Sequence, residues 1–297
     1  FTEQYSALLY MLSQQKGSKL RSFVRNETVN NARNAYFERL GVATAQEITT
    51  RHGDTPLNEI PHSRRRLTPA DYNTATLLDN ADQLKMLIDP KSPYANAQAM
   101  ELGRTIDDII ITNALGDVST GQSGGTTVAF KDDSRSMNGD GTITALGTLA
   151  SAGTETDITL AKILAMMNLF NEEDVDVDIP KYWCVSPREI QIMLAITEVN
   201  SADFNTVKAL TTGKVESYMG FTWIWSTRLP LDAASETATR TSAWAEDGII
   251  LGTAENITSR ITERDDKNYS VQVYSELSAG AIRLEGDKVH EALMDLA

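Results

Sequence analysis

The chain has 297 residues, of which 41% are hydrophobic and 23% charged, which excludes a disordered or fibrous protein and is typical of one large domain or two ordinary ones. No apolar run approaches the roughly 18 residues that a membrane helix needs. Residues 1–100 carry 12 basic and 10 acidic groups, whereas the remainder carries 15 basic and 31 acidic groups, and such an acidic body disfavours a dedicated DNA-binding module.

The first forty residues predict an arm rather than a self-contained unit. Apolar residues recur at helical spacing near the start and indicate a short amphipathic helix: Tyr5, Leu8, Leu9 and Leu12. Beyond Gly17 the sequence is polar and rich in asparagine, so we expect the arm to pack on another surface. The chain does not open with a basic flank and an apolar stretch, and no secretory signal is expected.

Residues 41–80 predict an extended loop without support of its own. The sequence Gly53-Asp54-Thr55-Pro56 is a turn signal between two arms that have no helical period. A hairpin with so little apolar surface is marginal in water, so it needs a partner to lie on. The basic cluster Arg64-Arg65-Arg66 falls within this segment, and the acidic remainder of the chain predicts electrostatic complementarity between copies.

The strongest helix signal follows. Ser92 is a natural N-cap, Pro93 a natural first-turn residue, and Gly116 stands where a C-terminal glycine belongs, which predicts a helix over residues 94–115. Its length would be about 33 Å at the usual rise per residue. The stretch 116–156 is rich in Gly, Ser, Thr and Asp and predicts a loop or a short hairpin.

The second half mixes helices and strands. A helix is expected from Thr156, as its cap, to Phe170, with an acidic run after it at 172–178. Trp183-Cys184-Val185 indicates a short buried strand, and Ser186-Pro187-Arg188-Glu189 a capping box that opens another helix.

The remainder of the chain is mainly strand-like. Phe221, Trp223 and Trp225 alternate with other residues and predict a half-buried strand. Residues 235–242 indicate a loop, and three further strands are expected at 248–251, 271–274 and 281–284. The prediction is an α+β chain with two or three helices and a mainly antiparallel sheet.

No motif predicts catalysis or a bound metal. Gly121–Gly125 matches the G-x-S-x-G nucleophile elbow around Ser123, but the elbow needs an apolar strand before it and a helix after it, and only His290 follows as a base. The single Cys184 and the scattered histidines form no metal-ligand cluster, and nothing around the acidic run fixes a geometry for a cation. We therefore expect no enzyme, cofactor or metal, and a hydrolase using Ser123 is a distant alternative.

The order of these segments resembles the major capsid proteins of tailed bacteriophages, a fold shared with encapsulin shells. The resemblance rests on short motifs in the family's order: Asp71-Tyr72, Leu78–Asp82, Ala99–Arg104 with Asp107-Asp108, Gly116–Gly125, Val185–Pro187, Gly213–Val215, Met219–Phe221 and Gly280–Arg283. It implies an N-terminal arm at 1–40, an extended loop at 41–80, a peripheral domain with a long spine helix at 81–171 and 246–297, and an axial domain at 172–245.

The resemblance also implies a function. Copies would assemble into pentamers and hexamers and form an icosahedral shell around double-stranded DNA, which they contact by non-specific proximity. Portal and scaffolding or decoration proteins would be partners, assembly would occur in the host cytoplasm, and no membrane would take part. An encapsulin-like nanocompartment shell is the alternative.

The family's self-crosslinking variant uses a lysine in the extended loop. Residues 41–80 contain no lysine, so no covalent crosslink of that kind is expected here. Non-covalent contacts should hold the shell together instead. The residues expected to contact neighbouring subunits are Arg64, Arg65, Arg66, His52, Tyr36 and Phe37.

Overall fold

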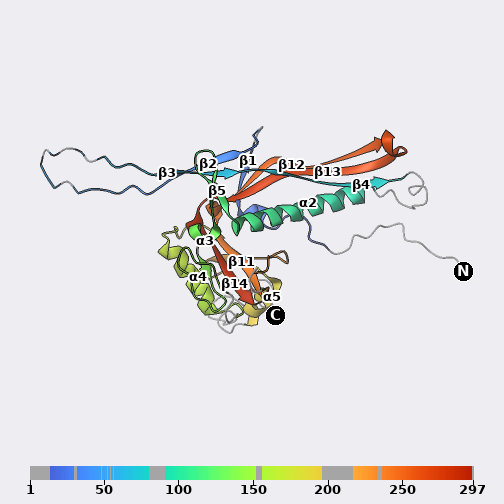
Figure 1. Cartoon of the computed structure of the whole chain (residues 1–297). Helices are drawn as coiled ribbons and strands as arrows, with labels where there is room; N and C mark the ends of the chain where they lie inside the picture. The colour runs from blue at the N-terminus through green and yellow to red at the C-terminus, as the bar shows by residue number, and fades with distance from the viewer. Residues whose placement is uncertain are drawn as a thin grey trace.

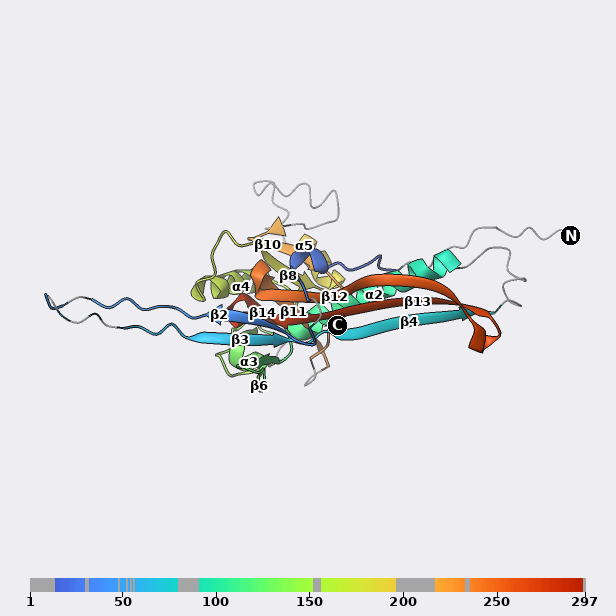
Figure 2. The ribbon, with the colours of Figure 1, turned by 90° about the horizontal axis from the view of Figure 1, so that it is seen from above.

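The structure, a computed structural model, describes residues 14–29, 32–47, 49–51, 53, 55, 57–79, 91–151, 156–195, 217–232 and 236–295. Within them lie three sheets and a long helix, α2 (Lys91–Ala114), which runs along one of the sheets (Figure 1). The expected α+β class is confirmed. Seen from above, the molecule is elongated, with a thin hairpin at one end and a long strand pair at the other (Figure 2). The amphipathic helix predicted around Tyr5 lies outside the described residues.

The other helical elements are all shorter than α2. The other α-helices are α3 (Phe130–Asp133), α4 (Leu160–Glu172) and α5 (Pro187–Ala195), and the 3-10 turns are η1 (Arg21–Phe23), η3 (Glu246–Gly248), η4 (Asp265–Lys267) and η5 (Gly286–Lys288). In the described part of the chain, no helix has both the length and the apolar character to cross a bilayer.

The first sheet has the order β1-β12-β13-β4 and carries α2 on one face. Its strands are β1 (Arg25–Thr28), β12 (Ile249–Arg264), β13 (Ser270–Arg283) and β4 (Ala70–Leu78). Leu102, Ile106 and Ile110 of α2 are buried in the main core, as a helix stripe facing a sheet should be. Gln98 fixes the helix further along, because its amide donates to the Val273 carbonyl at 3.1 Å.

The predicted long helix is confirmed, but it has 24 residues and its start differs from the predicted one. It begins at Lys91, so Ser92 and Pro93 lie in its first turn instead of before it. The predicted helix end is confirmed to within one residue, and Gly116 follows it.

The second sheet has the order β7-β14-β11-β8-β10-β9 and is buried on both faces at its centre. Its strands are β7 (Ser136–Met137), β14 (Val289–Asp295), β11 (Ala238–Ala245), β8 (Lys181–Val185), β10 (Phe221–Trp225) and β9 (Ser217–Tyr218). Trp183 packs on the α4 side, whereas Cys184 belongs to the core under α2. Every residue of β8 is therefore buried, as the sequence predicted for a short apolar strand. Trp225, predicted on a half-buried face, is 46% exposed.

Three local predictions concern the helices and strands of the second sheet and its surroundings: one is confirmed and two are wrong. Ser186 caps α5 as predicted, since its Oγ accepts from the Glu189 amide at 3.3 Å. The cap of α4 is Thr159 and not Thr156, because the Thr159 side chain reaches the Lys162 amide. The predicted loop at 235–242 is wrong over 238–242, which belongs to β11.

The third sheet has the order β2-β3-β5-β6 and forms the root of the projecting hairpin. Its strands are β2 (Ala35–Leu40), β3 (His62–Leu67), β5 (Val118–Thr120) and β6 (Thr126–Val128), so the short hairpin expected within 116–156 is present. Residues 70–78, expected in the extended loop, instead form β4 and pair with β13 along their whole length. The projecting segment is thus limited to the connection between β2 and β3.

Candidate assembly surfaces

The connection between β2 and β3, residues 41–61, reaches away from the body of the subunit (Figures 1 and 2). The amide of Gly41 donates to the Pro61 carbonyl at 2.8 Å and closes its base. Beyond that pair, every described residue is exposed. Apolar side chains are among them, with Val42 88% and Leu57 93% exposed. An exposed, extended hairpin bearing apolar side chains is suited to a partner surface.

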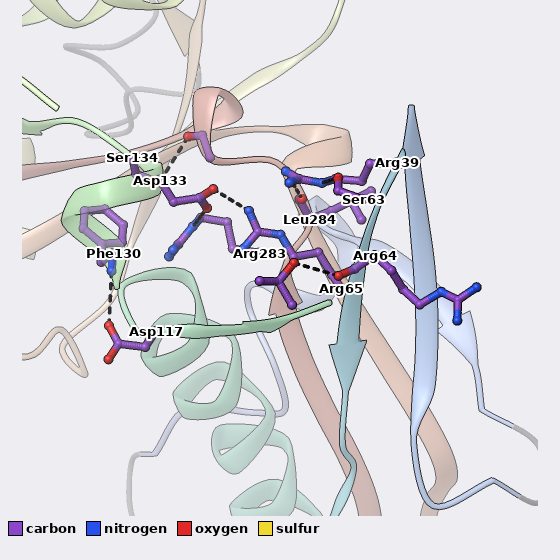
Figure 3. Close-up of polar contacts among 12 residues, drawn as sticks. Arg39, Ser63, Arg64, Arg65, Asp117, Phe130, Asp133, Ser134, Arg283 and Leu284 are labelled. Carbon is purple, nitrogen blue, oxygen red and sulfur yellow. Dashed lines mark hydrogen bonds and ion pairs between the residues drawn. The ribbon is translucent and has the colours of Figure 1, made fainter. Parts of the chain in front are cut away.

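The root of the hairpin is fixed to the body by a cluster of three charged side chains, Arg65, Asp133 and Arg283, which we call the Asp133 cluster (Figure 3). Arg65 on β3 binds one carboxylate oxygen of Asp133, and Arg283 on β13 binds the other at 2.9 Å. Arg283 also donates to the carbonyls of Ala114 at 2.9 Å and Gly116 at 2.8 Å. One cluster therefore joins the hairpin, α3, the first sheet and the end of α2.

The two arginines of the Asp133 cluster are buried, and the side chain of Asp133 is 12% exposed. The side chains of Arg65 and Arg283 are 1% and 0% exposed, and the guanidinium of Arg283 lies 4.7 Å from the ring centroid of Phe130. Burial lowers the pKa of Arg283 from its usual value. Two buried cations that share one carboxylate make that carboxylate indispensable, because removing it leaves charge without compensation.

A second contact holds the root on its other strand. Arg39 of β2 donates from Nε to Ser63 at 3.1 Å and from Nη1 to the Leu284 carbonyl at 3.0 Å (Figure 3). Both strands of the hairpin are thus tied to the end of β13. The hairpin projects from a fixed root.

The predicted basic cluster is divided by the alternation of β3. Arg65 faces the body and is buried, so it is not available to a neighbouring subunit, contrary to the expectation. Arg64 faces outward, where it pairs with Glu38 and lies 5.6 Å from the ring centroid of Tyr36. Arg66 reaches the Ser123 carbonyl at 3.4 Å.

The other predicted contact residues lie in different environments. Tyr36 is 41% exposed, whereas Phe37 packs on the small core of the third sheet. His52 lies outside the described residues. A role for Arg64, Arg66 and Tyr36 in contacts between subunits stays a prediction.

The N-terminal segment is held on α2 by Asp107, a residue whose role sequence reasoning did not assign. The carboxylate of Asp107 is fully buried and accepts from the amides of Lys19 and Leu20 at 3.0 Å, and from the side chains of Gln15 and Ser18. Its position between Ile106 and Ile110, on the apolar stripe of the helix, is the signal that could have indicated a buried carboxylate.

The segment also depends on a close backbone approach. A Cβ at Gly103 of α2 would lie 2.6 Å from the Cα of Gly17, which itself has φ +77°. The crossing therefore needs glycine at both positions.

Ser123 and His290, the two residues of the alternative hydrolase, do not have the surroundings that a nucleophile elbow and its base require. Ser123 is exposed in the turn between β5 and β6, so strands flank it on both sides. His290 is fully buried in β14, with its ring 4.7 Å from that of Phe170, and burial lowers its pKa to about 3. The described residues hold no group of three His, Cys, Asp or Glu side chains able to bind a metal.

The subunit is elongated, of the α+β class, and carries a hairpin that, over its described residues, is anchored only at its root. These features are typical of proteins whose subunits pack against further copies of themselves. The chain belongs to the phage capsid protein family, whose profile matches residues 1–295. The resemblance proposed from sequence is confirmed, and the protein is a structural capsid protein.

Solved capsids share this fold at low identity. The capsid of cyanophage P-SCSP1u is 15% identical with a TM-score of 0.74, covering 100% of this chain and 94% of that one. The capsid of Helicobacter pylori bacteriophage KHP30 is 7% identical with a TM-score of 0.73, covering 100% and 96%. Mycobacterium phage Che8 gives 13% identity and a TM-score of 0.70, covering 98% and 96%. No curated protein sequence matches the chain.

Proposed function

We propose that copies of this protein assemble into pentamers and hexamers, which tile an icosahedral shell around double-stranded DNA. The observation that carries the proposal is the exposed hairpin on a rigid root. Its apolar side chains, Val42 and Leu57 above all, have no partner surface in their own subunit among the described residues. Laying the hairpin on a neighbour removes this surface from water, and burial of apolar area is the main driving force for association.

The geometry of this contact favours rings. A hairpin that lies on a different surface of the next copy is a head-to-tail contact, which closes into a ring when the rotation between copies closes. Each subunit touches several neighbours, so individually weak contacts act together. The Asp133 cluster supports this role because it fixes the direction in which the hairpin leaves the body.

We also propose a division of the subunit into domains. The first sheet with α2 is the peripheral domain, and the second sheet with α4 and α5 is the axial domain. This modifies the sequence-based boundaries, since α4, β7 and β14 move to the axial domain. The pairing of β14 with both β11 and β7 supports the change. The N-terminal arm stays within 1–40.

The partners of a virion protein follow from the same proposal. Portal and scaffolding or decoration proteins would join the shell, and assembly would take place in the host cytoplasm before the protein enters the virion. An encapsulin-like compartment has the same subunit fold but a protein cargo. The contents of the particle, DNA or protein, therefore distinguish a virus capsid from an encapsulin-like compartment.

The proposal is tested by expressing the full chain and purifying the large particles by gradient sedimentation. Negative-stain images report whether closed shells with fivefold and sixfold units form. A second sample, particles purified from infected cells, is treated with nuclease from outside. Its ratio of absorbance at 260 and 280 nm then reports DNA protected inside the shell. Shells holding only protein would favour the compartment reading, and the absence of shells would contradict both.

A further inference from the structure

Three basic side chains without a carboxylate partner in the described part of the structure lie close together in the sequence of the N-terminal segment. These side chains, which we call the basic strip, are Lys16, Lys19 and Arg21. Among the described residues, none of the three has a carboxylate within salt-bridge distance. Each is at least partly exposed. In a chain with a formal charge of −14, three such cations in six residues form a local exception.

The carboxylates around the strip are already engaged. Glu101 pairs with Arg104, and Asp108 pairs with Arg228. Glu27 pairs with Arg25 at 2.7 Å. The buried carboxylate of Asp107 accepts from Gln15, Ser18 and the amides of Lys19 and Leu20, as described above. These carboxylates leave the strip without a neutralising partner in the described part of the chain, so its charge is available to an external anion.

The strip borders a groove of suitable chemistry. The groove has a volume of about 450 Å³ and lies between the N-terminal segment, α2 and β12; it is lined by Gly17, Ser18, Arg21, Ser22, Asn26, Gly103, Ile106 and Ile257. Of its lining groups, the Ser18 hydroxyl already donates to Asp107 and the Asn26 amide to the carbonyls of Arg21 and Val24. The Arg21 guanidinium and the Ser22 hydroxyl are left, and both are groups that bind phosphate oxygens in proteins. The guanidinium of Arg21 keeps its place at the groove through one hydrogen bond, at 2.8 Å, to Asn256.

An aromatic ring extends the strip on the other side. The ammonium of Lys19 lies 3.0 Å from the ring centroid of Trp225, and it donates to the Trp225 carbonyl at 3.2 Å. Trp225 ends β10 and is 46% exposed. This contact fixes the Lys19 ammonium at the surface instead of leaving it on a free stem. In Figure 1 the dark-blue segment passes beside α2, away from the projecting hairpin.

We propose that the basic strip contacts the phosphate backbone of packaged duplex DNA and that it lines the inner wall of the shell. This inference rests on the proposed function and adds the surface that meets the genome. The ligand is a run of phosphates and not a single anion, because Lys19 and Arg21 are held by different partners, Trp225 and Asn256, and do not bond a common centre. The acidic remainder of the protein repels DNA and limits the contact to this strip, which lets the genome move over the wall.

The test measures DNA binding by unassembled full-length protein. Fluorescence anisotropy of a short labelled duplex is recorded over a series of salt concentrations starting at low ionic strength. The variant is the double substitution Lys16→Gln and Arg21→Gln. The matched control is Lys131→Gln with Lys267→Gln, which removes the same charge from distant surfaces. Circular dichroism confirms that each variant is folded.

The strip variant should bind DNA more weakly than the wild type. The slope of its plot of log affinity against log salt concentration should be shallower by roughly 0.9 for each phosphate no longer neutralised, about 2 for the two lost charges. The control should keep the wild-type slope. Equal weakening in both variants, or no binding by wild-type protein at low salt, would overturn the proposal. Part of each protein is set aside under assembly conditions and imaged, so shells from a wild-type protein that does not bind DNA refute the strip alone, and DNA binding by a protein that forms no shells under assembly conditions refutes the assembly proposal.

Discussion

The Nε atom of Arg283 lies 2.9 Å from the Oδ2 atom of Asp133, and this contact joins the long strand β13 to the short helix under the hairpin root. The second oxygen of the same carboxylate is bound by Arg65 of β3. One side chain of α3 therefore connects the hairpin to the first sheet. The direction of the hairpin depends on this largely buried carboxylate.

Replacing Asp133 by asparagine should strongly destabilise the subunit. The change leaves two buried guanidiniums without a carboxylate, which costs about 3–5 kcal/mol for a broken buried pair. Urea unfolding followed by tryptophan fluorescence measures the loss. The control Glu38→Gln removes the exposed partner of Arg64 and should change stability little. Equal midpoints for Asp133→Asn and the wild type would contradict this account of the root.

Replacing Asp107 by asparagine should release the N-terminal segment from α2. The carboxylate accepts from two backbone amides and two side chains, and each charge-assisted hydrogen bond is worth about 1.5–3 kcal/mol. Hydrogen exchange of the amides of Lys19 and Leu20 should become much faster. The neighbouring change Asp108→Asn, which removes only a partly exposed ion pair, should leave that exchange unaffected. Unchanged protection in Asp107→Asn would refute the role of this carboxylate.

His290 should make the subunit sensitive to acid. Burial, and secondarily the charge of Arg135, lowers its pKa from 6.5 to about 3 in the folded chain. The unfolded chain therefore binds a proton first, so the stabilisation is complete above pH 6.5, declines as the pH falls from 6.5 towards 3, and is lost below that. The slope from this one group is about 1.4 kcal/mol per pH unit.

The variant His290→Leu tests this slope. Its free energy of unfolding should depend less on pH between 6 and 4 than that of the wild type. The matched change His62→Leu, at an exposed position, should keep the wild-type slope. Parallel curves for His290→Leu and the wild type would show that His290 does not contribute.

The exposed apolar residues of the hairpin should matter for assembly and not for folding. The double change Val42→Asp and Leu57→Asp places charges on side chains that are 88% and 93% exposed, so the melting temperature of the subunit should stay the same. Particle yield in sedimentation should fall strongly, because the charges would be buried at the contact between copies. The conservative pair Val42→Ile and Leu57→Met should assemble normally.

Apolar patterns and caps were sufficient to predict several elements from the sequence. The run Trp183-Cys184-Val185 predicted β8, and the capping box at Ser186 predicted the start of α5. These signals are local, because a short apolar run or a cap carries its own physical reason. The same holds for the unsupported hairpin after β2, where the lack of apolar pattern was itself the signal.

The sequence failed where partners lie far along the chain. Strand β11 looked like a loop because its side chains are small and polar. In the fold Thr241 accepts from the Trp183 indole at 3.1 Å and donates to the Ala292 carbonyl at 2.9 Å, so this hydroxyl is satisfied within the sheet. Arg65 looked like part of a surface cluster because Asp133 lies 68 residues away. No local pattern could indicate either contact.

The central claim is that the connection between β2 and β3 needs a neighbouring copy. Light scattering after size-exclusion chromatography tests it on two proteins: the full chain, and a variant in which residues 43–59 are replaced by an Asn-Gly turn closing the pair Gly41 and Pro61. We predict that the full chain forms shells, whereas the shortened chain keeps its melting temperature and stays a small species. A full chain that remains monomeric at high concentration, or a shortened chain that forms normal shells, would contradict the claim.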